Sequence, residues 1–184
     1  MTNKRVASML SAALFGCLLS SQALAHVTLE TQSAEPGSFY KAVLKLPHGC
    51  DGSPTVKLEV DLPDGFISAK PMVKPGWTIE TEKGAYDREY AFLHGMTLKD
   101  GVRKIVWSGG EVPEAFYDEF VVTGFLATEL EPGPIYFPVK QVCAEGDVSW
   151  SELPKDGEDP HSLKAPAPQL MLNAPAEAGG HHHP

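Results

Sequence analysis

The sequence predicts an all-β fold, an antiparallel sandwich of two sheets. Along much of the chain apolar residues alternate with polar ones, as at Tyr40, Ala42, Leu44 and Leu46. An alternation of period two is typical of strands that bury one face. Turn sequences rich in Pro, Gly and Asp separate the apolar runs, and no long stretch carries apolar residues at helical spacing. Short strands at such intervals favour a two-sheet sandwich.

The expected strands extend through one domain, residues 26–173, which is followed by a tail, residues 174–184. In chain order they cover residues 27–29, 40–46, 56–62, 77–81, 89–93, 103–108, 119–127, 135–142, 148–152 and 169–172. Turns are expected between them at residues 63–65, 74–76, 99–101, 131–133 and 145–147, each of which contains Gly beside Pro or Asp. The tail is expected to fray.

The first 25 residues have the features of a secretory signal peptide. A basic start precedes an apolar run over residues 6–19, and residues 23–25 form a small-residue cleavage site. The apolar run is shorter than the roughly 20 residues of a membrane-spanning helix. We therefore expect export to the periplasm and a mature chain that begins at His26.

Cys17 offers an alternative start. Residues 14–17 resemble the cleavage box of bacterial lipoproteins, in which the cysteine is lipidated. Phe15 stands where that box has a small residue, and the apolar run continues past Cys17 to the later site. A lipidated Cys17 would leave His26 inside the chain.

The net charge limits the classes of partner, and the cysteine content indicates the compartment. Loss of Lys4 and Arg5 leaves 13 basic against 24 acidic residues, a net charge of −11. This charge argues against nucleic acid or an anionic membrane as partner. Cys50 and Cys143 remain, and two cysteines in an oxidising compartment are most simply a disulfide. The alternative, a thiolate metal pair, is disfavoured because C-x-x-C spacing is absent.

His26 carries the most informative chemistry. Cleavage gives it a free α-amine, and this nitrogen and Nδ1 of the same residue can chelate one metal ion. Both donors suit Cu(II), which has the highest affinity among divalent first-row ions. An α-amine with its ordinary pKa of about 7.7 to 8 loses its proton to copper at modest cost near neutral pH. On composition alone, a histidine here is more simply an accident of where the signal ends.

Several segments, in their order and spacing, resemble the YcnI-like family of bacterial copper-binding domains. The resemblance extends from His26 to about Leu172. It is carried by the His26-Val27-Thr28-Leu29 start, a strand over residues 40–47 that ends in Leu-Pro, a strand over residues 54–60, the Lys74-Pro75-Gly76-Trp77 turn, the run over residues 105–110 and Trp150.

The resemblance implies a cupredoxin-like or immunoglobulin-like sandwich with Cu(II) held by the N-terminal histidine. The family places a tryptophan near the metal, which Trp150 matches in position, and a carboxylate in the loop after Leu-Pro. Here His48 follows the proline instead. His48 is therefore the first candidate for the replacement ligand and Asp51 the second. His48 has an alternative as a structural loop histidine, and Trp150 as a core residue.

Other candidate donors are a single turn histidine and the end of the chain. His94 ends an expected strand and is a weaker candidate ligand, with a structural role at the turn as its alternative. His181, His182 and His183 in the tail are suited to loose capture of copper or zinc. The acidic residues Glu111, Glu114, Asp118 and Glu119 are expected to form a solvated face.

We therefore expect a Cu(II)-binding chaperone or buffer rather than an enzyme, with other copper-trafficking proteins of the cell envelope as partners. One alternative is a copper-dependent oxygenase, which requires a second histidine such as His48 or His94. The other is a metal-free interaction sandwich. Hydrolase motifs such as G-x-S-x-G and H-E-x-x-H are absent from the sequence.

Overall fold

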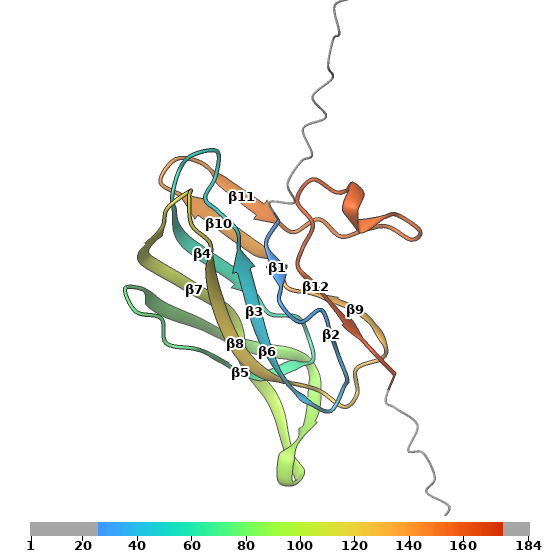
Figure 1. Ribbon diagram of the computed structural model, residues 1–184. Helices are drawn as coiled ribbons and strands as arrows, with labels where there is room; N and C mark the ends of the chain where they lie inside the picture. Colours follow the sequence, from blue (N-terminus) through green and yellow to red (C-terminus); the bar gives the residue numbers. More distant parts are fainter. Residues whose placement is uncertain (1–25, 175–184) are drawn as a thin grey trace, which may run out of the picture.

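The computed structural model describes residues 26–174, apart from the side chain of His161, and these residues form an all-β fold (Figure 1). The expected signal peptide, Cys17 and the histidines of the tail lie outside the described residues. In chain order the elements are β1 (Thr28–Leu29), β2 (Ser33–Ala34), β3 (Phe39–Leu46), β4 (Thr55–Asp61), β5 (Phe66–Pro71), β6 (Thr78–Phe92), the 3-10 turn η1 (Leu93–Gly95), β7 (Met96–Val112), β8 (Asp118–Leu126), β9 (Gly133–Tyr136), β10 (Val139–Cys143), β11 (Asp147–Trp150), the 3-10 turn η2 (Pro160–Ser162) and β12 (Gln169–Leu172).

Two antiparallel sheets enclose the main core. One sheet has the strand order β1-β3-β8-β5 and the other has the order β11-β10-β4-β7-β6. Because of the alternation seen in the sequence, the two sheets direct apolar side chains toward each other. One buried cluster contains Leu44 and Phe120 of the first sheet with Leu58 and Trp107 of the second. The predicted β-sandwich is therefore confirmed.

Phe120 on β8 links the two sheets at the centre of this core. Its ring lies edge-on to Trp107 of β7, with ring centroids 5.5 Å apart, and edge-on to Trp77, at 5.0 Å. The ammonium of Lys74 lies 4.5 Å from the centroid of the same ring. Edge-to-face pairs of this kind add to the free energy gained by burying each ring.

A third, smaller sheet with the order β2-β12-β9 was not expected from the sequence. The expected strand over residues 135–142 is divided into β9 and β10, which belong to different sheets. The division falls at Phe137 and Pro138, and a proline has no N–H to donate to a continuing ladder. In this sheet β12 pairs parallel with β2 and antiparallel with β9.

The hairpin of β6 and β7 differs most from the expected pattern. The turn expected at residues 99–101 is wrong, because Asp100 and Gly101 pair with Ala85 and Gly84 inside the hairpin. The register shifts between Ala85 and Tyr90, so residues 86–89 of β6 bulge opposite Lys99 and the Lys-Asp-Gly sequence stays within β7. The chain reverses at η1 instead, and Figure 1 shows this light green tip at the opposite end of the molecule from the start of β1.

The strand β5 was missed because its pattern is irregular. Phe66 and Ile67 are adjacent and both buried, and Ser68 has a positive φ of 53°. The pairing with β8 shifts register between Ile67 and Lys70. Such a bulge breaks the alternation of period two on which strand prediction depends.

Replacing Phe120 with Ala is expected to lower the free energy of unfolding by about 3 to 5 kcal/mol, because it empties a fully buried ring site between the two sheets. Urea denaturation followed by tryptophan fluorescence measures this change. Phe116→Ala is the matched control, since the Phe116 side chain is 64% exposed and its loss should change stability by less than about 0.5 kcal/mol. Equal effects of the two substitutions would contradict the assigned core.

Candidate functional site

His26 lies just before β1, where the edges of the two main sheets come together. β1 is the edge strand of one sheet and β11 the edge strand of the other. The His26 and Trp150 rings lie 5.4 Å apart, centroid to centroid, with an angle of 57° between their planes. His26, where the mature chain is expected to begin, and the tryptophan matched by the family resemblance are therefore in contact.

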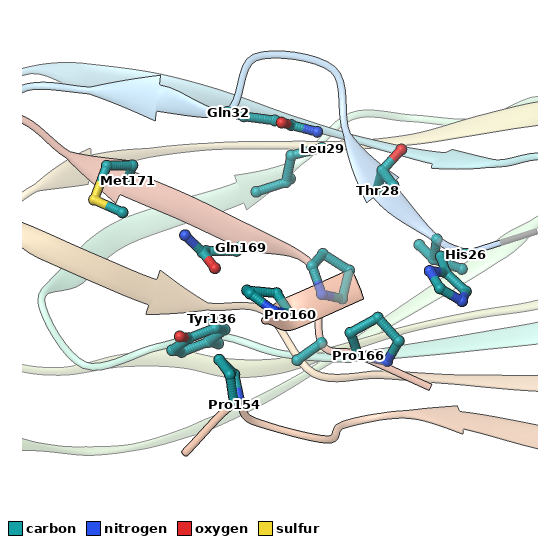
Figure 2. Close-up of a pocket in the computed structure, with 13 residues that line it drawn as sticks. His26, Thr28, Leu29, Gln32, Tyr136, Pro154, Pro160, Pro166, Gln169 and Met171 are labelled. Carbon is teal, nitrogen blue, oxygen red and sulfur yellow. The ribbon is translucent and has the colours of Figure 1, made fainter. Parts of the chain in front are cut away.

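A hollow of about 330 Å³ extends from His26 along the outer side of β12. Figure 2 shows His26 at one end and Met171 at the other, with Gln169 and Tyr136 between them. Pro166 borders the hollow close to His26 (Figure 2). The hollow therefore connects the imidazole of His26 to solvent, and its wall is uncharged.

A second hollow, of about 540 Å³, also has His26 in its wall and lies on the face that includes Lys45. The register pairs Lys45 with Thr28 on one side and with Glu119 on the other, so these side chains share one sheet face. Glu30 also lines the hollow. Two carboxylates against one ammonium give this wall a net negative charge, which favours the approach of a cation.

The amide of Gln141 on β10 connects Trp150 to the loop between β3 and β4. Trp150 Nε1–H donates to Gln141 Oε1 at 2.9 Å, and Gln141 Nε2–H donates to the backbone oxygen of His48 at 3.0 Å and to Thr55 Oγ1 at 2.8 Å. The Gln141 side chain is fully enclosed, at 1% exposure. A buried amide satisfied in this way fixes its partners relative to one another.

The geometry of His48 leaves one ring nitrogen suited to bind a metal. Nδ1 lies 2.7 Å from the carbonyl oxygen of Gly49. A carbonyl oxygen accepts only, so Nδ1 carries the proton, and in the neutral ring Nε2 then holds a lone pair. A histidine that binds metal through one nitrogen while the other donates to a carbonyl or carboxylate is the common arrangement in metal sites. His48 therefore has the tautomer that a ligand requires.

Glu114, in the loop between β7 and β8, has a side chain that is 39% exposed, as expected for a solvated face, but one of its carboxylate oxygens is turned inward. Its Oε1 lies 3.6 Å from Nδ1 of His48, and its Oε2 is buried without a hydrogen-bond partner among the described residues. A Cβ at Gly49 would lie 2.7 Å from this Oε2, so the absence of a side chain at Gly49 admits the carboxylate. Sequence reasoning missed this residue because a loop glutamate near other acids has no distinguishing pattern.

The Cys50–Cys143 disulfide is present and holds the His48 loop on β10. It joins residues 93 positions apart, with Cα atoms separated by 6.1 Å. Thr55 Oγ1, one of the partners of Gln141, lies 3.6 Å from Cys143 Sγ. A structural disulfide is typical of an oxidising, extracytoplasmic compartment. Within residues 26–174, none of the helices has the length and apolar character needed to cross a membrane.

The two weaker candidates, Asp51 and His94, are not brought to His26. Asp51 is exposed and lines a separate, shallow hollow beside Ser53 and Glu145. His94 lies in η1 at the tip of the β6–β7 hairpin, which projects from the other end of the sandwich (Figure 1). The long pairing of β6 with β7 is the physical reason, since it continues to Met96 whereas β4 pairs with β7 only as far as Lys104, so the turn lies well past the end of β4.

The donors at this end fit a copper ion held mainly by nitrogen. Among the residues that the structure describes, no three His, Cys, Asp or Glu side chains gather around one point. A metal site at this place would have to draw on the His26 imidazole and, with the chain cleaved before His26, on its α-amine, and both are nitrogen donors of the kind that suits Cu(II). The unpartnered Glu114 oxygen beside His48 agrees with added positive charge at this place.

Gln141→Leu is expected to lower the free energy of unfolding by about 1 to 3 kcal/mol, because it leaves the indole N–H of Trp150 and the oxygen of His48 without their buried partner. Near-ultraviolet circular dichroism should change with it, since the Trp150 ring loses its anchor. Gln169→Leu is the control, as Gln169 is only partly buried on the outer side of β12. An unchanged urea midpoint for Gln141→Leu would refute this network.

Comparison with solved structures supports the fold. The crystal structure of an uncharacterized protein from Nocardia farcinica, which has an immunoglobulin-like fold, is 24% identical, covers 80% of this chain and 97% of its own, and has a TM-score of 0.57. A family 123 glycoside hydrolase from Clostridium perfringens is 5% identical over 77% of this chain and 22% of its own, with a TM-score of 0.31 that supports no inference.

Comparison with protein families identifies the chain more directly. No curated protein matches it. A family model described as "Domain of unknown function (DUF1775)" matches residues 26–172, which is the whole sandwich from His26 to the end of β12. The chain therefore belongs to the DUF1775 family, the YcnI-like family that its sequence resembles.

Proposed function

We propose that this protein is a periplasmic Cu(II)-binding protein, a copper chaperone or buffer that uses His26 as the first residue of the mature chain. The observation that carries the proposal is the contact of the His26 ring with Trp150 at an open edge of the sandwich. The disulfide supports export to an oxidising compartment.

The chain supplies two nitrogen donors from His26 alone, the α-amine and Nδ1. Binding through these two atoms closes a chelate ring without any other part of the fold having to move. Nε2 of His48 is the next donor, because its Nδ1 is already occupied by the Gly49 carbonyl. A Cu(II) ion held by so few donors would have coordination positions that are vacant or weakly held. A receiving protein needs such positions in order to exchange the ligands of the ion.

Trp150 has a supporting role at this site. Its indole N–H is held by Gln141, so the ring meets His26 through its apolar part, tilted at 57°, and not through its nitrogen. An apolar face beside a metal excludes water and limits which ligands approach. Trp150 itself is 7% exposed and therefore belongs to both the core and the site.

The candidate site is open to solvent on one side. This openness suits a protein that passes copper to another protein better than one that keeps copper as a buried cofactor. His26 borders both hollows, and the second hollow is lined by Glu30 and Glu119. The mature charge of −11 attracts cations and basic surfaces. Copper-trafficking proteins of the cell envelope are therefore the partners that we propose.

The proposal predicts that His26→Ala abolishes tight binding of one equivalent of Cu(II). The protein is expressed with its own signal, and mass spectrometry establishes that the chain begins at His26. Copper is then titrated into the wild type and the variant and followed by electron paramagnetic resonance. The wild type should show hyperfine structure from the imidazole nitrogen that the variant lacks, because His26→Ala keeps the α-amine but has no Nδ1 with which to close the chelate ring.

Two controls separate His26 from the other histidines. His94→Ala should bind copper like the wild type, since His94 lies at the far hairpin tip. A variant with His181, His182 and His183 replaced by Ala removes binding by the tail. A mature start at Cys17, or equal copper binding by His26→Ala in the tail variant, would overturn the proposal that His26 holds the copper. Absence of tight copper binding by the wild type would favour a metal-free interaction sandwich.

A further inference from the structure

Two loops meet beside His48, although they are far apart in the sequence. The loop between β3 and β4 contributes His48 and Gly49, and the loop between β7 and β8 contributes Glu114. Both loops cross from one main sheet to the other, at the end of the sandwich where Cys50 is tied to β10. The backbone of the first loop is held further by Gln141 through the oxygen of His48.

The carboxylate of Glu114 occupies an unfavourable position in the absence of added positive charge. Oε2 is buried without a partner among the described residues, and Oε1 lies 3.6 Å from Nδ1 of His48. A buried carboxylate oxygen without a donor has lost hydration that it does not regain from the protein. The position becomes favourable when the neighbouring imidazole gains positive character.

The backbone is shaped to admit this carboxylate. A Cβ built on Gly49 would lie 2.7 Å from Glu114 Oε2 and 2.1 Å from the backbone oxygen of Ser53. The Cys50 N–H donates to Ser53 O, and the Ser53 N–H donates to Cys50 O, both at 2.8 Å. Gly49 therefore lies in a tight, hydrogen-bonded turn that has room for the glutamate oxygen and for no side chain of its own.

We propose that Glu114 is a positioning residue of the copper site, which acts through His48. The Gly49 carbonyl accepts the Nδ1 proton, and the Glu114 carboxylate lies beside the same nitrogen, so Nε2 is left to bind the metal. Binding of Cu(II) at Nε2 draws electron density from the ring and makes Nδ1–H more positive. The Glu114 charge stabilises that change, as a carboxylate does behind many metal-bound histidines.

This inference rests on the proposed function, and it adds a residue from a different loop to the site. It also gives a reason for a carboxylate whose Oε1 lies beside the His48 ring while its Oε2 is buried without a partner among the described residues. The charge of Glu114, rather than its shape, is the property that matters. Glu114→Gln preserves the size of the side chain and removes the charge, so it tests the inference without emptying the loop.

The test begins with the metal-free wild-type protein. Long-range proton–nitrogen correlation spectra of the ¹⁵N-labelled protein should show the His48 ring with its proton on Nδ1. Glu114→Gln should keep this tautomer, because the Gly49 carbonyl remains as acceptor. A wild-type ring with its proton on Nε2 would overturn the inference before any copper is added.

Copper affinity then measures the contribution of the charge. We expect Glu114→Gln to raise the Cu(II) dissociation constant about 10-fold, the low end of the range for losing a partner behind a metal ligand. The matched control is Glu111→Gln, which removes the same charge from an exposed residue of β7 and should change the constant less than about twofold. In a His48→Ala background, Glu114→Gln should have no further effect, since Glu114 acts through His48.

The outcomes separate this inference from the proposed function. If His26→Ala abolishes copper binding while Glu114→Gln binds like the wild type, only the role of Glu114 fails. The same holds if Glu114→Gln weakens binding equally with and without His48. If His26→Ala binds copper like the wild type, the proposed function fails and the role of Glu114 fails with it. A tenfold loss that depends on His48 supports both.

Discussion

The buried amide of Gln141 is the contact on which the arrangement of the candidate site depends. Gln141 is itself 1% exposed, so its amide must find its hydrogen-bond partners within the protein, and it does so on three different segments. Its hydrogen bonds join β11 through Trp150, the start of β4 through Thr55 and the β3–β4 loop through His48. The indole under His26 and the loop that carries the second imidazole are thereby fixed to the same strand.

Local pattern in the sequence was sufficient for some parts of this site and insufficient for others. His26 follows from a cleavage signal, and the pairing of Cys50 with Cys143 follows from a count of the cysteines that remain. Gln141 had a signal that could have been used, because it stands between Val139 and Cys143 on the inward face of an otherwise apolar strand. Glu114 had none, since its partner lies more than sixty residues away and only the fold brings them together.

The difference between local pattern and long-range contact also explains which strands could be predicted from the sequence. β3 and β8 were predictable because each is a run rich in apolar residues without a turn sequence, although β8 is buried on both faces for most of its length. The β6–β7 hairpin was not, because its outer half extends beyond β4, and a register shift replaces the turn that Asp100 and Gly101 suggested. Turn chemistry identifies where a backbone can bend, and long-range pairing decides whether it does.

The contrast between a braced loop and an open edge is what suits this end of the molecule to exchange of a metal ion. On one side the disulfide, Gln141 and the Gly49 turn restrict His48 to a single arrangement. On the other side His26 precedes a two-residue edge strand and borders two hollows. In the proposed function, a firmly held His48 would give the site its selectivity, while His26 at the edge would remain within reach of a second protein. A centre enclosed on all sides would bind copper more tightly but would release it more slowly.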